Sequence, residues 1–207
     1  MTRYAFFDLD YTLTHKDTGT LFLLYNLKRR PSLFFRMIAG VVLVPLWKLK
    51  LLPLWRLKQF FFGFLKEMAE KELLRLSQEF VDIIWEKVIK PEGITELKRL
   101  RAEGYVPVLI SASPHFYVAF FAEKLGIEHF AGTRYEIIGG FVSGKMDGPD
   151  CRGQEKVQRI AELVDLRSYD RMNSVAYSDS DADLPLLMLA GKAFKVARRE
   201  WRLKLRE

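Results

Sequence analysis

The residues best suited to chemistry lie near the start of the chain, where an apolar strand runs directly into two carboxylates. Residues 4–14 read Tyr-Ala-Phe-Phe-Asp-Leu-Asp-Tyr-Thr-Leu-Thr, which places Asp8, Asp10 and the hydroxyl of Thr12 at alternate positions. In an extended chain these side chains project on the same side, so the two negative charges repel each other. A divalent cation and a phosphoryl group together balance that repulsion. The pattern therefore favours metal-assisted phosphoryl chemistry.

Three further polar segments follow later in the chain. Ser111 comes directly after the apolar residues 106–110, and a hydroxyl beside free backbone N–H groups at a helix start forms an anion site. Lys156 lies at the start of a predicted helix, where its amine can place a positive charge on a phosphate. Residues 178–183 bring acids after another apolar strand. An open α/β sheet gathers such segments at the carboxyl ends of its strands.

Each segment also has a purely structural interpretation. Asp8 and Asp10 can be solvated turn acids, Ser111 a helix N-cap, Lys156 a surface lysine, and residues 178–183 a cluster that stabilises the next helix. Four such segments in one chain, each at the end of a predicted element, favour the functional interpretation over coincidence.

The elements that must position these residues alternate between strand and helix in the second half of the chain. Nearly continuous apolar residues predict buried parallel strands, helical spacing predicts amphipathic helices, and Gly139-Gly140 predicts a hairpin turn. We therefore expect an α/β fold with a doubly wound parallel sheet. The predicted segments are helices 94–103, 116–125 and 156–164, strands 105–110 and 174–177, and a hairpin of 135–138 with 141–143.

A helical, aromatic and basic insertion interrupts this α/β region. We expect residues 1–13 and 91–207 to form a Rossmann-like core and residues 14–90 to form an inserted helical domain. Between residues 14 and 66 there are ten lysines or arginines and one acid, Asp17, against a net charge of +7 for the whole chain. Such a basic segment suits nucleic acid, anionic lipid or an acidic substrate. A single cysteine, Cys151, excludes an intrachain disulfide, and without a signal-peptide pattern we expect a cytoplasmic protein.

In order and residue type, the four segments resemble the four motifs of the haloacid dehalogenase (HAD) superfamily. The helical insertion, the helix start at Pro91-Glu92-Gly93 and the Gly-x-x-Lys pattern ending at Lys156 are similar to the phosphoserine-phosphatase-like group. This resemblance implies Mg²⁺-dependent hydrolysis of a phosphomonoester through a phosphoaspartyl intermediate. It also implies that the insertion, residues 14–90, is a cap that closes over the site and selects the leaving group.

The resemblance implies a role for each matching residue. Asp8 is expected to be the nucleophile and Asp10 the general acid and base. Asp183 is expected to orient Lys156 or a metal-bound water, and Asp17 either contacts a substrate amine or only begins a helix. The expected phosphate ligands are Thr12, Ser111, Ala112 and Lys156, and the expected Mg²⁺ ligands are Asp8, the backbone carbonyl of Asp10, and Asp179.

Three departures from the family pattern leave the substrate open. Tyr11 replaces a small residue, Ser113 stands where phosphoserine phosphatases usually have glycine, and residues 178–183 lack the glycines of the fourth motif. These changes surround the expected pocket, whereas the catalytic acids are present. The reaction is therefore predicted more firmly than its leaving group.

The cap provides the remaining evidence about substrate. Its apolar run at residues 37–47 is shorter than a transmembrane helix, and Pro45 and Pro53 interrupt its continuation. The aromatics either form the core of a small bundle or, beside basic residues, lie on an anionic bilayer. In the second case the cap resembles that of the phosphatidylglycerophosphatase C family.

We therefore expect a phosphorylated substrate, with an anionic lipid phosphate slightly ahead of phosphoserine or another small metabolite. The lipid interpretation adds peripheral contact with the inner face of the membrane. Two non-enzymatic alternatives rank lower: a receiver domain, which lacks a cap and carries its phosphoacceptor on a later strand, and nucleic-acid binding by the basic segment.

Overall fold

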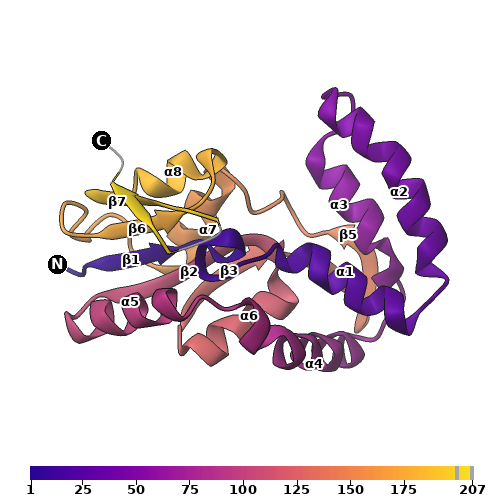
Figure 1. The fold of residues 1–207 in the computed structure, drawn as a ribbon, viewed down its shortest axis with the longest axis horizontal. Coiled ribbons are helices and arrows are strands. Elements are labelled where there is room, and N and C mark those ends of the chain that lie inside the picture. The colour runs from indigo at the N-terminus through magenta and orange to yellow at the C-terminus, as the bar shows by residue number, and fades with distance from the viewer. Residues whose placement is uncertain (199–200, 206–207) are drawn as a thin grey trace.

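A computed structural model describes residues 1–198 and 201–205, so residues 199–200 and 206–207 of the predicted core lie outside the described residues. Its main feature is a six-stranded sheet (Figure 1). Neighbouring strands are parallel except at the pair β7–β8, which is antiparallel. In spatial order the strands are β3 (His129–Thr133), β2 (Val106–Pro114), β1 (Tyr4–Phe7), β6 (Val175–Ser178), β7 (Lys192–Val196) and β8 (Leu203–Leu205).

Strand β1 lies inside the sheet between β2 and β6, and all four of its residues are buried. Ala5 and Phe7 join the hydrophobic cluster on one face, and Tyr4 and Phe6 join the cluster on the other. This alternation is the period of two expected for a strand between two layers. The central position of β1 places the residues that follow it at the carboxyl edge of the parallel sheet.

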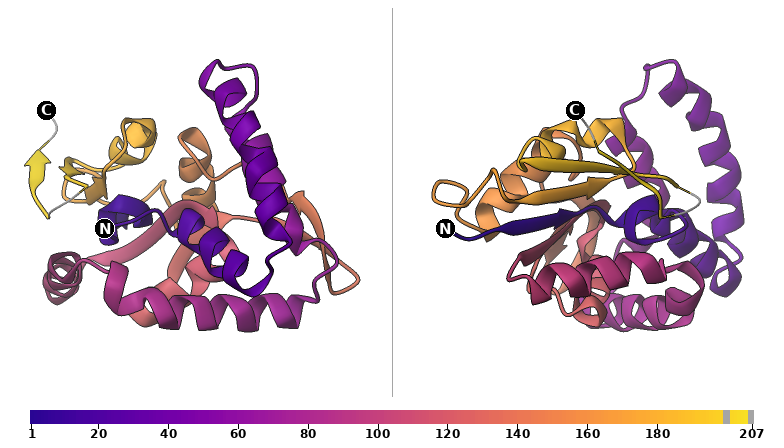
Figure 2. Two further views of the ribbon diagram at one scale, coloured as in Figure 1. Left: turned by 45° about the vertical axis from the view of Figure 1, so that its right-hand side comes forward. Right: turned by 60° about the vertical axis from the view of Figure 1, so that its left-hand side comes forward.

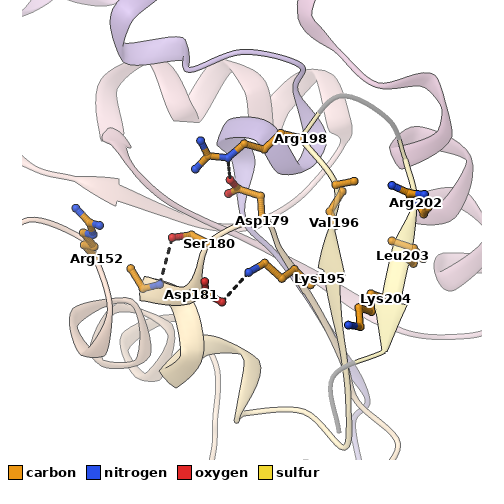
Figure 3. A pocket seen from close by; sticks show the side chains of 12 residues that line it. Arg152, Asp179, Ser180, Asp181, Lys195, Val196, Arg198, Arg202, Leu203 and Lys204 are labelled. Carbon is orange, nitrogen blue, oxygen red and sulfur yellow. Dashed lines mark hydrogen bonds and ion pairs between the residues drawn. The ribbon is translucent and has the colours of Figure 1, made fainter.

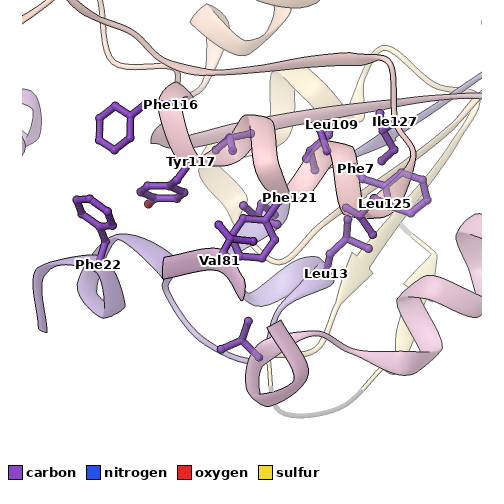
Figure 4. Packing of buried hydrophobic residues seen from close by; sticks show 14 of the residues in the cluster. Phe7, Leu13, Phe22, Val81, Leu109, Phe116, Tyr117, Phe121, Leu125 and Ile127 are labelled. Atoms are coloured by element: carbon purple, nitrogen blue, oxygen red, sulfur yellow. The ribbon is translucent and has the colours of Figure 1, made fainter. Parts of the chain in front are cut away.

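Helices cover both faces of the sheet, which confirms the predicted doubly wound α/β fold. Figure 4 shows one face, where Phe121 of α6 packs near Leu109 of β2 and Phe7 of β1. The other face holds a smaller cluster, including the fully buried Cys151, whose thiol pKa is raised by burial to about 12. The first face is covered by α4 (Glu70–Val88), α5 (Pro91–Ala102) and α6 (His115–Leu125), the second by α7 (Gln154–Leu163) and α8 (Leu184–Leu187).

The insertion contains helices α1 (Thr18–Arg29), α2 (Leu33–Lys48) and α3 (Leu54–Phe62), followed by α4. Helices α2 and α3 pack side by side and extend away from the sheet (Figures 1 and 2). Gly40 permits this contact, since a Cβ there would lie 2.2 Å from the ring of Phe61. Phe22 of α1 joins the main core, where its ring packs against Tyr117 (Figure 4). It also packs against the ring of Phe80.

The predicted hairpin is present as β4 (Tyr135–Ile138) and β5 (Phe141–Met146). Backbone hydrogen bonds attach it to the end of the insertion: Glu67 donates to Val142, Val142 donates to Met68, and Glu70 donates to Gly140. Residues from both sides of position 90 thus form one small unit. The division of the chain at residues 13 and 90 remains a prediction.

The outer surface of the α2–α3 hairpin is apolar. Nine of the nineteen large hydrophobic side chains that are exposed in the described residues lie between Phe34 and Trp55, including Val41 and Val42 at 68 % exposure each. Among the described helices, none is both long and apolar enough to cross a membrane. The apolar side chains of the cap therefore divide between a packed inner side and an exposed outer face. We call this outer face the α2 face, and it consists of Phe34, Phe35, Ile38, Val41, Val42, Leu46, Leu49, Leu51 and Trp55.

Candidate active site

Asp8 lies at the carboxyl end of β1, where it is almost completely buried. Its Oδ1 accepts a hydrogen bond from Lys156 Nζ at 2.5 Å, and its Oδ2 accepts one from the Thr12 hydroxyl at 3.0 Å. Burial raises the pKa of Asp8 above its ordinary value, and the positive charge of Lys156 opposes this rise. Ionisation of Asp8 therefore depends on the cation beside it.

Lys156 joins two acids that are far apart in the sequence. It is 1 % exposed, and its Nζ also donates to Asp183 Oδ2 at 2.7 Å. Asp183 accepts a further bond from the Ser178 hydroxyl at 2.7 Å. Although burial lowers it, the two carboxylates together raise the pKa of Lys156 above its usual range. The lysine is thus held charged between Asp8 and Asp183, and an orienting role for Asp183 stays a prediction.

Thr12 connects the first acidic segment with the last. Its fully buried hydroxyl donates to Asp8 and accepts the backbone N–H of Asp179 at 3.0 Å. Both bonds are to protein groups, so the geometry gives Thr12 a positioning role for Asp8. Direct contact between Thr12 and a phosphate remains a prediction.

The chain after Asp8 does not stay extended, so the expectation that Asp8 and Asp10 project alike from an extended segment is wrong. Residues Leu9–Leu13 form a tight turn in which Tyr11 adopts a positive φ of 58°. The turn is closed by Thr14, whose N–H donates to Leu9 at 3.1 Å. Buried Lys90 also donates to the Tyr11 carbonyl, at 2.6 Å. The two catalytic candidates consequently bind different sets of partners.

The Asp10 carboxylate is directed toward the cap side of the site. Its Oδ1 accepts the backbone N–H and the hydroxyl of Thr18 at 2.7 and 2.6 Å. Its Oδ2 accepts the hydroxyls of Ser113 and Ser111 at 2.6 and 3.4 Å. Burial raises the pKa of Asp10 and the charge of Asp17 adds to the rise, although these hydrogen bonds oppose it. A raised pKa suits a group that carries a proton.

Ser111 is not at the start of a helix, contrary to the sequence-based expectation. Strand β2 continues to Pro114, with a shift in its pairing to β3 between Ile110 and Pro114, and α6 begins only at His115. The Ser111 hydroxyl instead accepts the backbone N–H of Ser113 at 3.0 Å and reaches Asp10. Pairing with β3 extends the strand, so Ser111 and Ala112 lie within the last four residues of β2.

Asp179 follows β6 and faces a wide groove of about 900 Å³ (Figure 3). Its Oδ2 accepts a bond from Arg198 Nε at 2.7 Å, and the guanidinium of Arg198 lies 4.7 Å from the centre of the Tyr11 ring. The positive residues of this groove favour the approach of an anion to this edge of the sheet. They are Arg152, Lys195, Arg198, Arg202 and Lys204.

The oxygen donors at this edge fit a hard divalent cation. No group of three His, Cys, Asp or Glu side chains within 1–198 and 201–205 is positioned to hold a metal ion. The expected ligand set needs only two carboxylates, Asp8 and Asp179, with the backbone carbonyl of Asp10. Thr12 bonds to both of those acidic residues, and burial raises the pKa of each carboxyl. Mg²⁺ prefers such oxygen ligands.

Asp17 begins helix α1, as its structural interpretation predicted. Its Oδ1 accepts the backbone N–H of Thr20 at 2.7 Å, which is an N-cap bond. Asp17 also lines a cavity beside Asp10. Contact between Asp17 and a substrate amine therefore stays a prediction.

Sequence reasoning missed several residues that hold the site together. Thr18 supplies two of the hydrogen bonds to Asp10, and Ser113, noted only as a departure from the family pattern, supplies the shortest bond to Oδ2. Lys58 of α3 pairs with Asp150 at 2.7 Å and donates to the Ala112 carbonyl at 3.0 Å. This Lys58–Asp150 pair, which we call the clasp, joins the cap to the segment that contains Ser111. A hydroxyl or a lysine of this kind has no distinctive local pattern.

Comparison with known proteins agrees with this geometry. The family model of haloacid dehalogenase-like hydrolases matches residues 5–188. Protein CicA of Caulobacter vibrioides is 29% identical over 93% of this chain and 85% of its own length. Phosphoserine phosphatase SerB1 of Mycobacterium tuberculosis is 28% identical over 95% of this chain and 65% of its own. A Bordetella pertussis protein of unknown function has the same fold, with a TM-score of 0.82 and 23% identity over 95% and 91% of the two chains.

The chain therefore belongs to the haloacid dehalogenase-like hydrolase family, and it is an HAD-family phosphatase. The family resemblance predicted from the four motifs is confirmed, as is the phosphoserine-phosphatase-like grouping. This assignment excludes the alternative that the chain is a receiver domain. It leaves open the metal, the roles of individual residues and the leaving group.

Proposed function

We propose that this chain is a Mg²⁺-dependent phosphomonoesterase in which Asp8 attacks phosphorus and Asp10 transfers protons. One observation carries the proposal: Asp8 is held by Lys156 and Thr12, whereas Asp10 is held separately by Thr18 and Ser113. Two nearby carboxylates in different environments can perform different tasks.

The proposed reaction has two steps. An Asp8 oxygen forms a bond to phosphorus, the ester oxygen leaves, and protonated Asp10 gives that oxygen its proton. Asp10 then takes a proton from a water molecule, whose oxygen attacks phosphorus and displaces the Asp8 carboxylate. Phosphate is released, and Asp10 is again protonated. Lys156 offsets the repulsion between Asp8 and the phosphoryl oxygens, and Asp183 holds the lysine in place.

Mg²⁺ is proposed to bind to Asp8, Asp179 and the backbone carbonyl of Asp10. When bound, it supplies positive charge to the phosphoryl oxygens. Ser111 and Lys156 are proposed as phosphate ligands with the backbone of Ala112.

A soluble phosphomonoester is the first candidate substrate, which reverses the order expected from the sequence. The support is the similarity to a relative named as a phosphoserine phosphatase. The comparisons provide no corresponding support for a lipid phosphate. The lipid interpretation thus depends on the cap alone.

An anionic lipid phosphate is the second candidate, and the α2 face favours it. Exposed Val41, Val42 and Leu51 lie on a hairpin that also carries Lys48, Lys50 and Arg56. Apolar side chains beside cations suit peripheral contact with an anionic bilayer. Large exposed apolar patches commonly mark binding surfaces.

The reaction is tested by Mg²⁺-dependent release of phosphate from an aryl phosphate. We expect Asp8→Asn to abolish turnover without unfolding the chain, while the exposed Asp147→Asn leaves turnover unchanged. Removal of Mg²⁺ with a chelator should stop the reaction and added Mg²⁺ should restore it. Near-normal activity of Asp8→Asn would exclude Asp8 as the nucleophile.

The two substrates are separated by assaying phosphoserine beside phosphatidylglycerophosphate in mixed micelles. Preference for the soluble ester supports the first candidate. If lipid turnover is higher, and the double variant Val41→Ser with Val42→Ser lowers lipid turnover alone, the second candidate replaces the first.

A further inference from the structure

A cavity of about 290 Å³ lies beside Asp10, between the core and the cap. Asp10, Ala112, Ser113 and Pro114 form its core side, and Asp8 is not among its lining residues. The cavity is therefore on the side of the proposed proton carrier. A leaving oxygen protonated by Asp10 would place the rest of the leaving group there.

The cap contributes mainly apolar side chains to this cavity. They come from three different helices, α1, α2 and α3, so the wall depends on how these helices are placed against the core. The polar cap residues in this lining are Asp17, Thr20 and Lys58. The apolar lining residues are Leu23, Met37, Leu54, Leu57, Phe61 and Phe62.

The two cap residues with charge at this cavity already have partners in the protein. Lys58 forms the clasp with Asp150 and bonds to the Ala112 carbonyl. Asp17 accepts the N-cap bond from Thr20. An anionic leaving group would compete with Asp150 for Lys58. An ammonium group would have the Asp17 carboxylate but would otherwise lie against apolar side chains, where its lost hydration is not replaced.

We infer that this cavity is the leaving-group subsite and that it takes an apolar alcohol. The inference rests on the proposed function and narrows it to monoesters whose alcohol part is an alkyl or similarly apolar group. The phosphate binds beside Asp8 and Lys156, and the apolar part of the ester lies against Leu54, Leu57 and Phe61. Burial of each additional methylene favours binding of the reacting ester.

The subsite is tested with a series of ethyl, butyl and hexyl phosphate, with phosphoserine as the charged comparison. The alkyl leaving groups have similar acidity, so the series varies burial and not bond strength. We expect kcat/KM to rise about fourfold per methylene until the cavity is full. Hexyl phosphate should exceed phosphoserine.

A matched pair of variants locates the effect. Leu54 lies in the cavity wall, and the control residue Leu74 lies on α4 at 42 % exposure, outside both the cavity and the α2 face. We expect Leu54→Asn to reduce kcat/KM for hexyl phosphate by about tenfold or more, with little change for ethyl phosphate. Leu74→Asn should leave the whole series unchanged. Thermal unfolding of both variants checks that each is folded.

The outcomes separate the subsite from the reaction. Hydrolysis of all esters with no dependence on chain length, or with phosphoserine preferred, would overturn the subsite and leave the phosphatase reaction intact. An equal effect of Leu74→Asn and Leu54→Asn would also overturn it. If no ester is hydrolysed by the Mg²⁺-loaded enzyme, the proposed function and the subsite both fail.

Discussion

Two regions depart from the rule that charged side chains are exposed and apolar side chains are buried. The centre around Asp8 buries charged residues, and the α2 face exposes apolar ones. At the centre, Asp8, Lys156 and Asp183 are charged yet buried, and each pairs with another of the three. On the α2 face, apolar side chains such as Val41 and Val42 are exposed. Both arrangements cost free energy in an isolated chain. The buried charges are explained by partners inside the protein, whereas the exposed apolar residues are consistent with the external partner proposed above.

The largest stability effect should come from Lys156→Met. Removal of the cation leaves Asp8 and Asp183 buried without their shared partner, so we expect a loss of about 3–5 kcal/mol in the free energy of unfolding. Activity should fall by about 10²- to 10³-fold or more. Lys195→Met is the matched control, because Lys195 pairs with the exposed Asp181. The control should change stability by about 1 kcal/mol or less, and equal losses in the two variants would contradict the contrast.

Thr12→Val should have the next largest effect. Valine keeps the shape of threonine but removes the hydroxyl bonds to Asp8 and to the Asp179 N–H. We expect a loss of about 1–3 kcal/mol in stability and of about 10- to 100-fold in activity. Thr12→Ser should retain much of both. The exposed Thr95→Val, which loses only a bond to the Pro91 carbonyl, provides the control for melting and kinetic measurements.

Removing the clasp should lower the free energy of unfolding by a smaller amount, and the losses from its two residues should not add. Lys58→Met leaves Asp150 partly buried without its cation, so about 1–3 kcal/mol of stability should be lost. Asp150→Asn in the same chain should recover part of that loss, because the unpaired charge is then absent. A double-mutant cycle from chemical denaturation measures the coupling. Additive losses would show that the clasp does not join cap and core.

The smallest effect is expected on the α2 face itself. Val41→Ser and Val42→Ser should each change the free energy of unfolding by about 0.5 kcal/mol or less, because both side chains are exposed. Gly40→Ala on the inner side of the same helix should cost about 1–3 kcal/mol, because the new Cβ overlaps the Phe61 ring. Melting curves of the three variants test the contrast, and a large loss at Val41 would show that the face is packed.

The arrangement of the core could be predicted from sequence because its signals are local. A continuous apolar run predicts β2, and helical spacing with a terminal glycine predicts α6, so the acids after β1 and β6 could be placed at one edge of a sheet. Asp8, Lys156 and Asp183 do meet there. Their meeting depends on topology alone, which the strand and helix pattern already determines.

The remaining features depend on contacts that no local pattern records. Lys58 and Asp150 are 92 residues apart, and neither residue type indicates a clasp. The turn at Tyr11 accepts a hydrogen bond from Lys90 at the end of the insertion, a contact that the local sequence does not indicate, so an extended segment was the simpler expectation. The length of β2 depends on its pairing with β3. The sequence also could not show whether the apolar side chains of the α2 face are exposed or packed, because an apolar run has the same pattern in a core and on a surface.

The most direct test of the account is to identify the residue that carries phosphate during turnover. The enzyme would be mixed with radiolabelled aryl phosphate and Mg²⁺, quenched in acid within one turnover, and digested for peptide analysis. We predict label on the peptide that contains Asp8, and no label in Asp8→Asn. Label on another residue, or turnover in Asp8→Asn without a labelled enzyme, would contradict the assignment of Asp8 as the nucleophile.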